Sequence, residues 1–278
     1  MAITKLLLNG VEYDIGNIYE IKTEGPQLYE GRELSEYTWA QLKTKCQNAD
    51  FSDLRVGDYK TITLTDGEVV KMQIAGIDTY YKSGVPSNRD FIPHHIDWIS
   101  IDCLYNKSFS WNNTDNNNGN STSPCPWLAS DICSGLNNKI YPTLPADVRA
   151  VIKNKKTKLE VRYSSSGKLT DSTRLDWKEM GNLWLPSEYE VFGSIIFGTK
   201  VYSQGQAVQY PLFANSCIHR IKRTGSEQQD ANNGWWLATV ASGNSTNCCY
   251  VTPEGDVSTI DSLGRYANLK IPVCFRIA

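Results

Sequence analysis

The sequence predicts an α+β fold made of small antiparallel sheets, two or more short helices and long ordered loops. Residues 58–64 and 68–77 are β-rich runs separated by a Thr-Asp-Gly turn, which is typical of a hairpin. Residues 127–140 and 145–152 have helical apolar spacing. From residue 241 to 260, polar turn clusters alternate with very short β runs. With 40% hydrophobic and 21% charged residues among 278, the chain can form a substantial core in one large domain or two ordinary ones.

The N-terminal residues 1–25 are predicted to form a β-hairpin and attachment segment, separate from a domain over residues 26–278. Asn9-Gly10 lies between two apolar runs, the strongest two-residue hairpin signal. The apolar run Leu6–Leu8 is too short for the core of a signal peptide or for a transmembrane helix. We therefore expect no signal peptide and no membrane insertion.

The next elements are a helix and a strand. Residues 35–48 carry Tyr37, Leu42 and Cys46 on a helical spacing, and Ser35 is the expected N-cap. Residues 97–104 are predicted to form a strand.

Two polar stretches are interpreted as solvated surface. Residues 111–122 are rich in Asn, and we expect them to form a solvated loop with nothing to pack. The basic run Lys153–Lys158 is typical of an exposed helix end and turn. The glycosylation-like triplets beginning at Asn120 and Asn244 are interpreted as chance matches in an Asn/Ser-rich chain.

Further elements follow toward the C-terminus. Pro145 suits the first turn of the second helix. Residues 183–192 predict a strand, a break at Pro186 and a short helix capped by Ser187. Residues 269–278 alternate like a strand with one buried face, and we expect this terminal strand to pair back into a sheet.

Trp235 and Trp236 begin a predicted strand over residues 235–239, so their side chains point to opposite faces. Either both belong to the core, or one of them forms the floor of a binding face.

Charge and the potential ligand residues exclude several function classes. The net charge of −2 provides no basic field for nucleic acid or anionic lipid, so no nucleic-acid partner is expected. The eight cysteines contain no CxxC spacing, and we expect buried free thiols. His94 and His95 are adjacent and are interpreted as structural. Glu254, Asp256 and Asp261 do not cluster as a calcium site would require. No metal and no cofactor is therefore expected.

Several motifs resemble a bacterial and phage family that has a C-type-lectin fold of the formylglycine-generating-enzyme type. The blocks Trp127–Ile152 and Leu183–Gly193 resemble the helical insert of this family. Trp235–Ala238 and Ile271–Arg276 resemble its two end-marking strands. The resemblance covers roughly residues 30–278 and implies a C-type-lectin-like domain with a helical insert at about 127–152. The enzyme relatives bind copper through a cysteine pair, which has no match here, so no catalytic residue and no enzyme activity is expected.

The C-terminal region is similar to the variable proteins of diversity-generating retroelements, whose exposed codons are rewritten at template adenines. Rewritten Asn codons yield mainly Asn, Ser, Thr, Gly, Asp, Ala, Cys, Tyr and Ile. These residues dominate the stretch Ala241–Tyr266, from which Trp, Met, Lys and Gln are absent. The resemblance implies a variable ligand-binding region at about 217–270. The expected ligand-binding residues are His219, Ser242, Asn244, Ser245, Asn247, Cys249, Tyr250, Thr252, Asp256, Ser258 and Tyr266.

The sequence thus predicts a receptor-recognition protein of a phage or prophage. Its C-terminal lectin-like surface would bind a host cell-surface molecule, either protein or glycan. We expect it on a virion tail fibre or spike, or on a bacterial cell surface, and family analogy favours a homotrimer. The alternative is a structural virion or cell-surface component that uses the same fold for assembly, without a diversified binding site.

Overall fold

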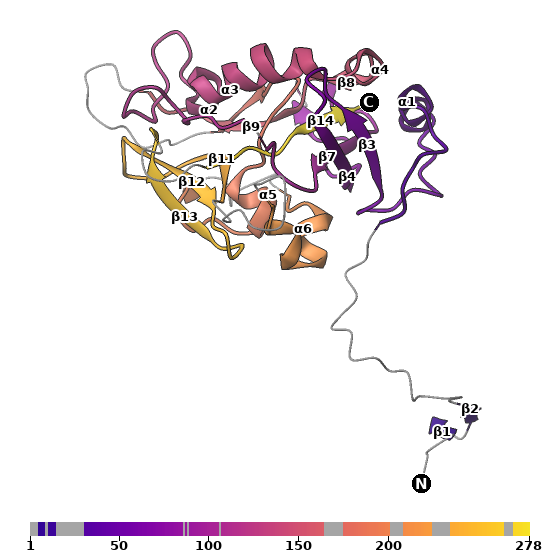
Figure 1. Cartoon of the computed structure of the whole chain (residues 1–278). Helices are drawn as coiled ribbons and strands as arrows, with labels where there is room; N and C mark the ends of the chain where they lie inside the picture. The colour runs from indigo at the N-terminus through magenta and orange to yellow at the C-terminus, as the bar shows by residue number, and fades with distance from the viewer. Residues whose placement is uncertain are drawn as a thin grey trace. The chain divides into compact units, whose positions relative to one another are not determined.

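The computed structural model (Figure 1) divides the chain into two units, Met1–Glu30 and Gly31–Ala278. In the first unit, β1 (Lys5–Leu8) pairs antiparallel with β2 (Val11–Asp14). This pairing confirms the predicted hairpin strands, whereas the expected turn residues lie outside the described part of the chain. The structure describes residues 5–8, 11–14, 31–85, 87, 89–105, 107–163, 175–200, 208–223, 234–263 and 269–278.

The second unit is α+β, as predicted, and its largest sheet is a curled, five-stranded antiparallel half-barrel. The terminal strand β14 pairs with β7 on one side and β8 on the other, which confirms that the chain end returns to a sheet. The strand order is β3 (Tyr59–Thr63), β4 (Val69–Ile77), β7 (Ile96–Ser100), β14 (Cys274–Ile277) and β8 (Ile152–Lys153).

Helix α1 (Trp39–Gln47) packs on one face of this sheet. The Trp39 ring contacts Trp98 and Phe275 edge-on, at centroid distances of 5.1 and 5.7 Å. The N-cap is Thr38 rather than the predicted Ser35, because Thr38 and Gln41 form a reciprocal capping box.

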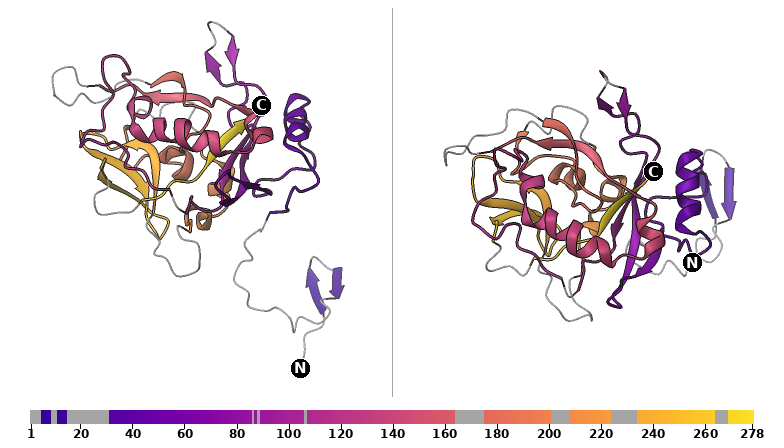
Figure 2. Two further views of the ribbon diagram at one scale, coloured as in Figure 1. Left: turned by 45° about the horizontal axis from the view of Figure 1, so that its top comes forward. Right: turned by 90° about the horizontal axis from the view of Figure 1, so that it is seen from above.

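The helical segment is more broken than the sequence predicts. It consists of α2 (Pro126–Ala129), α3 (Asp131–Gly135), the π-helical turn η3 (Leu136–Ile140), the 3-10 turn η4 (Tyr141–Thr143) and α4 (Ala146–Arg149). Ser130 ends α2 and caps α3 by accepting a hydrogen bond from the Cys133 amide. Pro145 is an N-cap rather than a first-turn residue. In both views of Figure 2, this helical segment begins near the sheet formed by residues 235–261 and ends near α1.

Two stretches that we expected to be solvated are partly core. In the Asn-rich stretch, Trp111 and Asn117 are fully buried and Asn118 is 8% exposed, so the expectation of a loop without packing is wrong. In the basic run, Lys155 is fully buried and its Nζ lies 2.5 Å from Glu190 Oε1. Long-range hydrogen-bond partners explain both results, because buried polar groups are stable when they are paired. The end of this run also forms part of β9 (Lys156–Glu160), which pairs with β10 (Leu175–Glu179).

A buried polar network lies against the half-barrel sheet. Asp97 receives two hydrogen bonds from the Arg276 guanidinium, both 2.7 Å, and one from the Tyr210 hydroxyl at 2.9 Å. His95 is fully buried and accepts a hydrogen bond from the Tyr80 amide at its Nε2, as expected for a structural histidine.

The remaining elements cover and extend this core. Helix α5 (Glu188–Phe192) begins at the predicted cap, Ser187, but no strand forms at residues 183–185. A second sheet contains β11 (Trp235–Val240), β12 (Asn247–Val251) and β13 (Val257–Asp261) in that order, which confirms the predicted alternation of turns and short strands. The other elements are β5 (Gly84–Val85), β6 (Asp90–Phe91), α6 (Pro211–Asn215) and the 3-10 turn η6 (Cys217–Arg220).

Candidate functional site

The candidate site is built on the three-stranded sheet β11–β12–β13. At β11, other parts of the chain pack on both faces of this sheet. Trp235 and Trp236 are fully buried and point to opposite faces. The Trp235 ring stacks on Phe213 of α6, with ring centroids 6.4 Å apart. The Trp236 indole donates to the Phe109 carbonyl oxygen at 2.8 Å on the other side. Both tryptophans therefore belong to the core, and neither forms the floor of an exposed face.

A buried arginine donates hydrogen bonds to the backbone of residues 241–247, which are the loop that connects β11 to β12 and the first residue of β12. Arg162 Nη1 donates to the Ala241 carbonyl at 2.8 Å, and Nη2 donates to the Asn244 carbonyl at 3.2 Å. Nη2 also donates to Asn117 Oδ1 at 2.6 Å. The Arg162 side chain is only 1% exposed, so water competes weakly for these bonds.

Asn117 provides a second support for the same loop. Its amide nitrogen donates to the carbonyl oxygens of Asn244 and Asn247, at 2.9 and 2.5 Å. Its backbone amide donates to the Ser245 carbonyl at 2.8 Å. The loop backbone is therefore fixed mainly by groups that lie outside the loop.

The side chains of this loop divide into structural and displayed residues. Asn244 Oδ1 accepts hydrogen bonds from the backbone amides of Thr246 and Asn247, both at 2.7 Å, so this predicted ligand residue also shapes the loop. Ser242 and Ser245 are exposed, and no hydrogen bond of either side-chain oxygen is found within the described residues. These two serines are the best-placed residues of the loop to contact a partner.

The turn between β12 and β13 packs against η6. A Cβ at Gly255 would lie 3.1 Å from the Ile221 side chain, which places residues 252–256 directly beside η6. Asp256 is exposed at this turn, and His219 is half-buried on η6. Burial and the nearby Lys222 ammonium lower the pKa of His219, so its imidazole is neutral near pH 7.

Fewer residues of the strands are exposed to solvent than the sequence predicts. Tyr250 and Ser258 are opposite each other and half-buried, and the Tyr250 ring contacts Trp236 edge-on. Cys249 is fully buried, so the expectation that it contacts a ligand from an exposed position is wrong. It points to the same face as Val251, where α5 and α6 cover the sheet.

The outcome for the predicted site residues is therefore mixed. Tyr266 lies outside the described residues. Exposed positions are Ser242, Ser245 and Asp256, and half-buried positions are His219, Asn244, Asn247, Tyr250, Thr252 and Ser258.

Exposed apolar side chains near this face were missed from the sequence. Ile218 of η6 is 38% exposed, and Ile221, which lies beside the Gly255 turn, is 41% exposed. Phe197 is 38% exposed, and its carbonyl accepts a hydrogen bond from the Ser242 amide at 2.8 Å. These three apolar residues do not recur with a helical or strand period, so the sequence alone does not indicate that they are exposed.

The cysteines are free thiols in this structure. Seven are buried, which agrees with the general expectation of buried thiols but not with the exposure expected for Cys249, and Cys217 is exposed. Burial raises the pKa of Cys248 and Cys249 well above the usual range, so both stay protonated and are poor metal ligands. Within the described part of the chain, no three His, Cys, Asp or Glu side chains are grouped so as to hold a metal ion.

The comparisons with known proteins assign the family. Residues 101–278, which include the helical segment and the whole candidate site, match the model of DUF6273, a domain of unknown function. The chain belongs to the DUF6273 family. No curated protein and no solved structure matches the chain. Among the described helices of this DUF6273 protein, none is long and apolar enough to cross a membrane.

Proposed function

We propose that this DUF6273 protein is a receptor-recognition protein that binds its partner through the C-terminal face. This face comprises the 241–247 loop, the 252–256 turn, strand β13 and η6. The supporting observation is that the side chains that hold the loop backbone are different from the side chains that are exposed on the loop. The backbone of residues 241–247 is held by Arg162 and Asn117, while Ser242 and Ser245 project outward.

Such an arrangement suits a binding surface whose residues change. Substitution of an exposed side chain leaves the backbone hydrogen bonds in place, so different residues can be presented on one scaffold. Small polar residues beside partly exposed aromatic and aliphatic groups also resemble the composition of antibody paratopes. This supports a C-type-lectin-like domain of the kind diversified by retroelements, used by a phage or prophage for host attachment.

The first experiment tests binding with matched variants. Ser242→Arg and Ser245→Arg place a long charged side chain on the face, and Ser134→Arg places the same change on an exposed position of α3. Retention of the three variants and the wild type is measured on a panel of immobilised intact bacteria and on a glycan array. We expect the first two variants to change retention and the third to behave as wild type, all with unchanged thermal unfolding.

The second experiment concerns diversification. We expect an adenine-rich near-repeat of the codons for residues 235–278 beside a reverse-transcriptase gene. Absence of the repeat would contradict diversification. Absence of retention on every cell and glycan, together with assembly into particles, would favour the alternative of a structural component.

A further inference from the structure

Strand β3 forms one outer edge of the half-barrel sheet. The outward backbone groups at both ends of this edge have hydrogen-bond partners within the chain. At one end, the Tyr59 amide donates to the Arg32 carbonyl at 2.9 Å, and the Leu34 amide donates to the Tyr59 carbonyl at 2.7 Å. At the other end, the Thr65 amide donates to the Thr143 carbonyl at 2.9 Å. The backbone groups of residues 59 and 65 therefore point away from β4.

Thr61 and Thr63 lie between these two occupied positions. Because backbone groups alternate in direction along a strand, the N–H and C=O groups of both residues point to the same outer edge. No hydrogen-bond partner for these backbone groups is found within the described residues. The interval from residue 59 to residue 65 is about 20 Å in an extended strand, so the open edge fits three or four residues.

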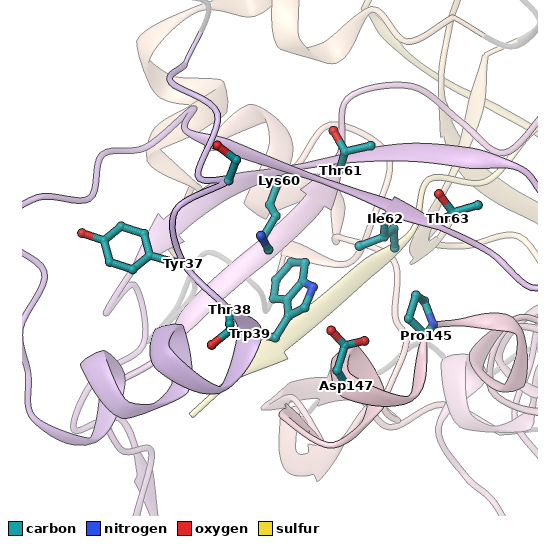
Figure 3. A pocket seen from close by; sticks show the side chains of 10 residues that line it. Tyr37, Thr38, Trp39, Lys60, Thr61, Ile62, Thr63, Pro145 and Asp147 are labelled. Carbon is teal, nitrogen blue, oxygen red and sulfur yellow. The ribbon is translucent and has the colours of Figure 1, made fainter.

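A groove of about 380 Å³ runs beside this open edge. Figure 3 shows the Lys60 and Trp39 side chains pointing toward each other in the groove, whereas Thr61 and Thr63 point away from it. Asp147 of α4 lies on the opposite wall. The other lining residues are Ser35, Tyr37, Thr38, Ile62 and Pro145.

The chemistry of the edge and the groove together selects a ligand class. Alternating N–H donors and C=O acceptors at strand spacing are complementary to the backbone of an extended polypeptide, and sugars and lipids lack this pattern. The Lys60 ammonium donates to the Leu34 carbonyl at 3.2 Å and has further protons to donate. It therefore favours a groove-facing ligand side chain that carries a hydrogen-bond acceptor.

We propose that the outer edge of β3 is a strand-addition site for a short extended segment of a partner protein. The segment pairs with Thr61 and Thr63 and places one acceptor-bearing side chain beside Lys60 and Ile62. Because both ends of the edge are closed, the site takes a chain end or a loop tip rather than a long strand. The inference is independent of the proposed receptor-binding face.

Proline substitution gives a selective test. Proline at residues 61 and 63 removes the outward N–H groups and leaves the hydrogen bonds to β4 intact, as edge strands tolerate. The double variant Thr61→Pro/Thr63→Pro is compared with Thr61→Val/Thr63→Val, which removes the same hydroxyl groups and keeps both N–H groups. The probe is a random heptapeptide phage library, selected on the wild type and counter-selected on the proline variant.

We expect synthetic copies of the selected peptides to bind the wild type and the valine variant equally and the proline variant at least roughly tenfold more weakly. The same peptides should slow hydrogen exchange of the Thr61 and Thr63 amides in the wild-type protein, a measurement that does not depend on how the variants fold. Selection of no discriminating peptide would overturn the proposal. So would protection of both amides in the free protein, or a wild-type dimer that the proline variant abolishes, because a second copy would then occupy the edge.

Discussion

Replacement of Arg162 by alanine tests whether this side chain supports the candidate face. The guanidinium makes three hydrogen bonds at 2.6–3.2 Å, two of them to carbonyls of the 241–247 loop. Hydrogen bonds to a charged group stabilise by about 1.5–3 kcal/mol each. The three share one side chain and are not additive, so we expect Arg162→Ala to lower the free energy of unfolding by about 3–5 kcal/mol. For a domain of this size the unfolding midpoint should fall by roughly 6–20 °C.

The assay is thermal unfolding followed by circular dichroism, together with hydrogen exchange of residues 241–247. The matched control is Arg223→Ala, which removes an arginine whose side chain is 71% exposed and paired with Asp102. An exposed ion pair stabilises by less than about 1 kcal/mol, so the control should unfold near the wild-type midpoint. If Arg162→Ala also costs less than about 1 kcal/mol, or if loop exchange is unchanged, the scaffold argument is wrong.

Three further outcomes are expected. Asp97→Asn breaks the buried pair with Arg276 and should lower the free energy of unfolding in urea by about 3–5 kcal/mol. Burial, and then the Arg276 charge, lower the pKa of His95 from 6.5 to about 4, so only the unfolded chain gains a proton between these values. The free energy of unfolding should therefore fall by about 1.4 kcal/mol per unit as the pH drops from 6.5 to about 4, and His95→Gln should remove this dependence. Cys249→Arg should prevent soluble expression by burying an unpaired charge, whereas Ser245→Arg should leave expression and the unfolding midpoint unchanged.

Local signals in the sequence predicted many elements correctly. The cap at Ser187 gave the start of α5, because its reciprocal partner Glu190 is only three residues away. The turn between β3 and β4 and the alternation in residues 269–278 are likewise short-range patterns. These elements form where local preference and tertiary packing agree.

The errors concern polar residues whose partners are distant in sequence. Asn117 bonds to Asn244 and Asn247 about 130 positions further on, and Lys155 pairs with Glu190. Neither pairing leaves a periodic pattern in the sequence, so both polar runs were interpreted from their composition alone. A buried polar group can be predicted only when its partner is known.

The site prediction failed at Cys249 for a different reason. The resemblance to variable proteins implied an exposed surface over residues 241–266, but it carries no information on which strand residues point outward. Strand β12 lies between β11 and β13 and is covered on both faces, so Cys248 and Cys249 are both buried. The exposed residues described in this region lie in the connections between strands, and β13 is half-buried along its length.

The same geometry restricts which residues of an exchangeable face can vary. Asn244 accepts two backbone amides of its own loop through its side-chain oxygen, a role that Asp can also fill but that a residue without a short side-chain acceptor cannot. Cys249 lies in the core, where larger or charged residues do not fit. Ser242 and Ser245 have neither constraint. A diversified face on this scaffold therefore requires variation at residues 242 and 245 and restriction at 244 and 249. Free variation at 244 among related copies of the gene would contradict the proposed division between scaffold and display.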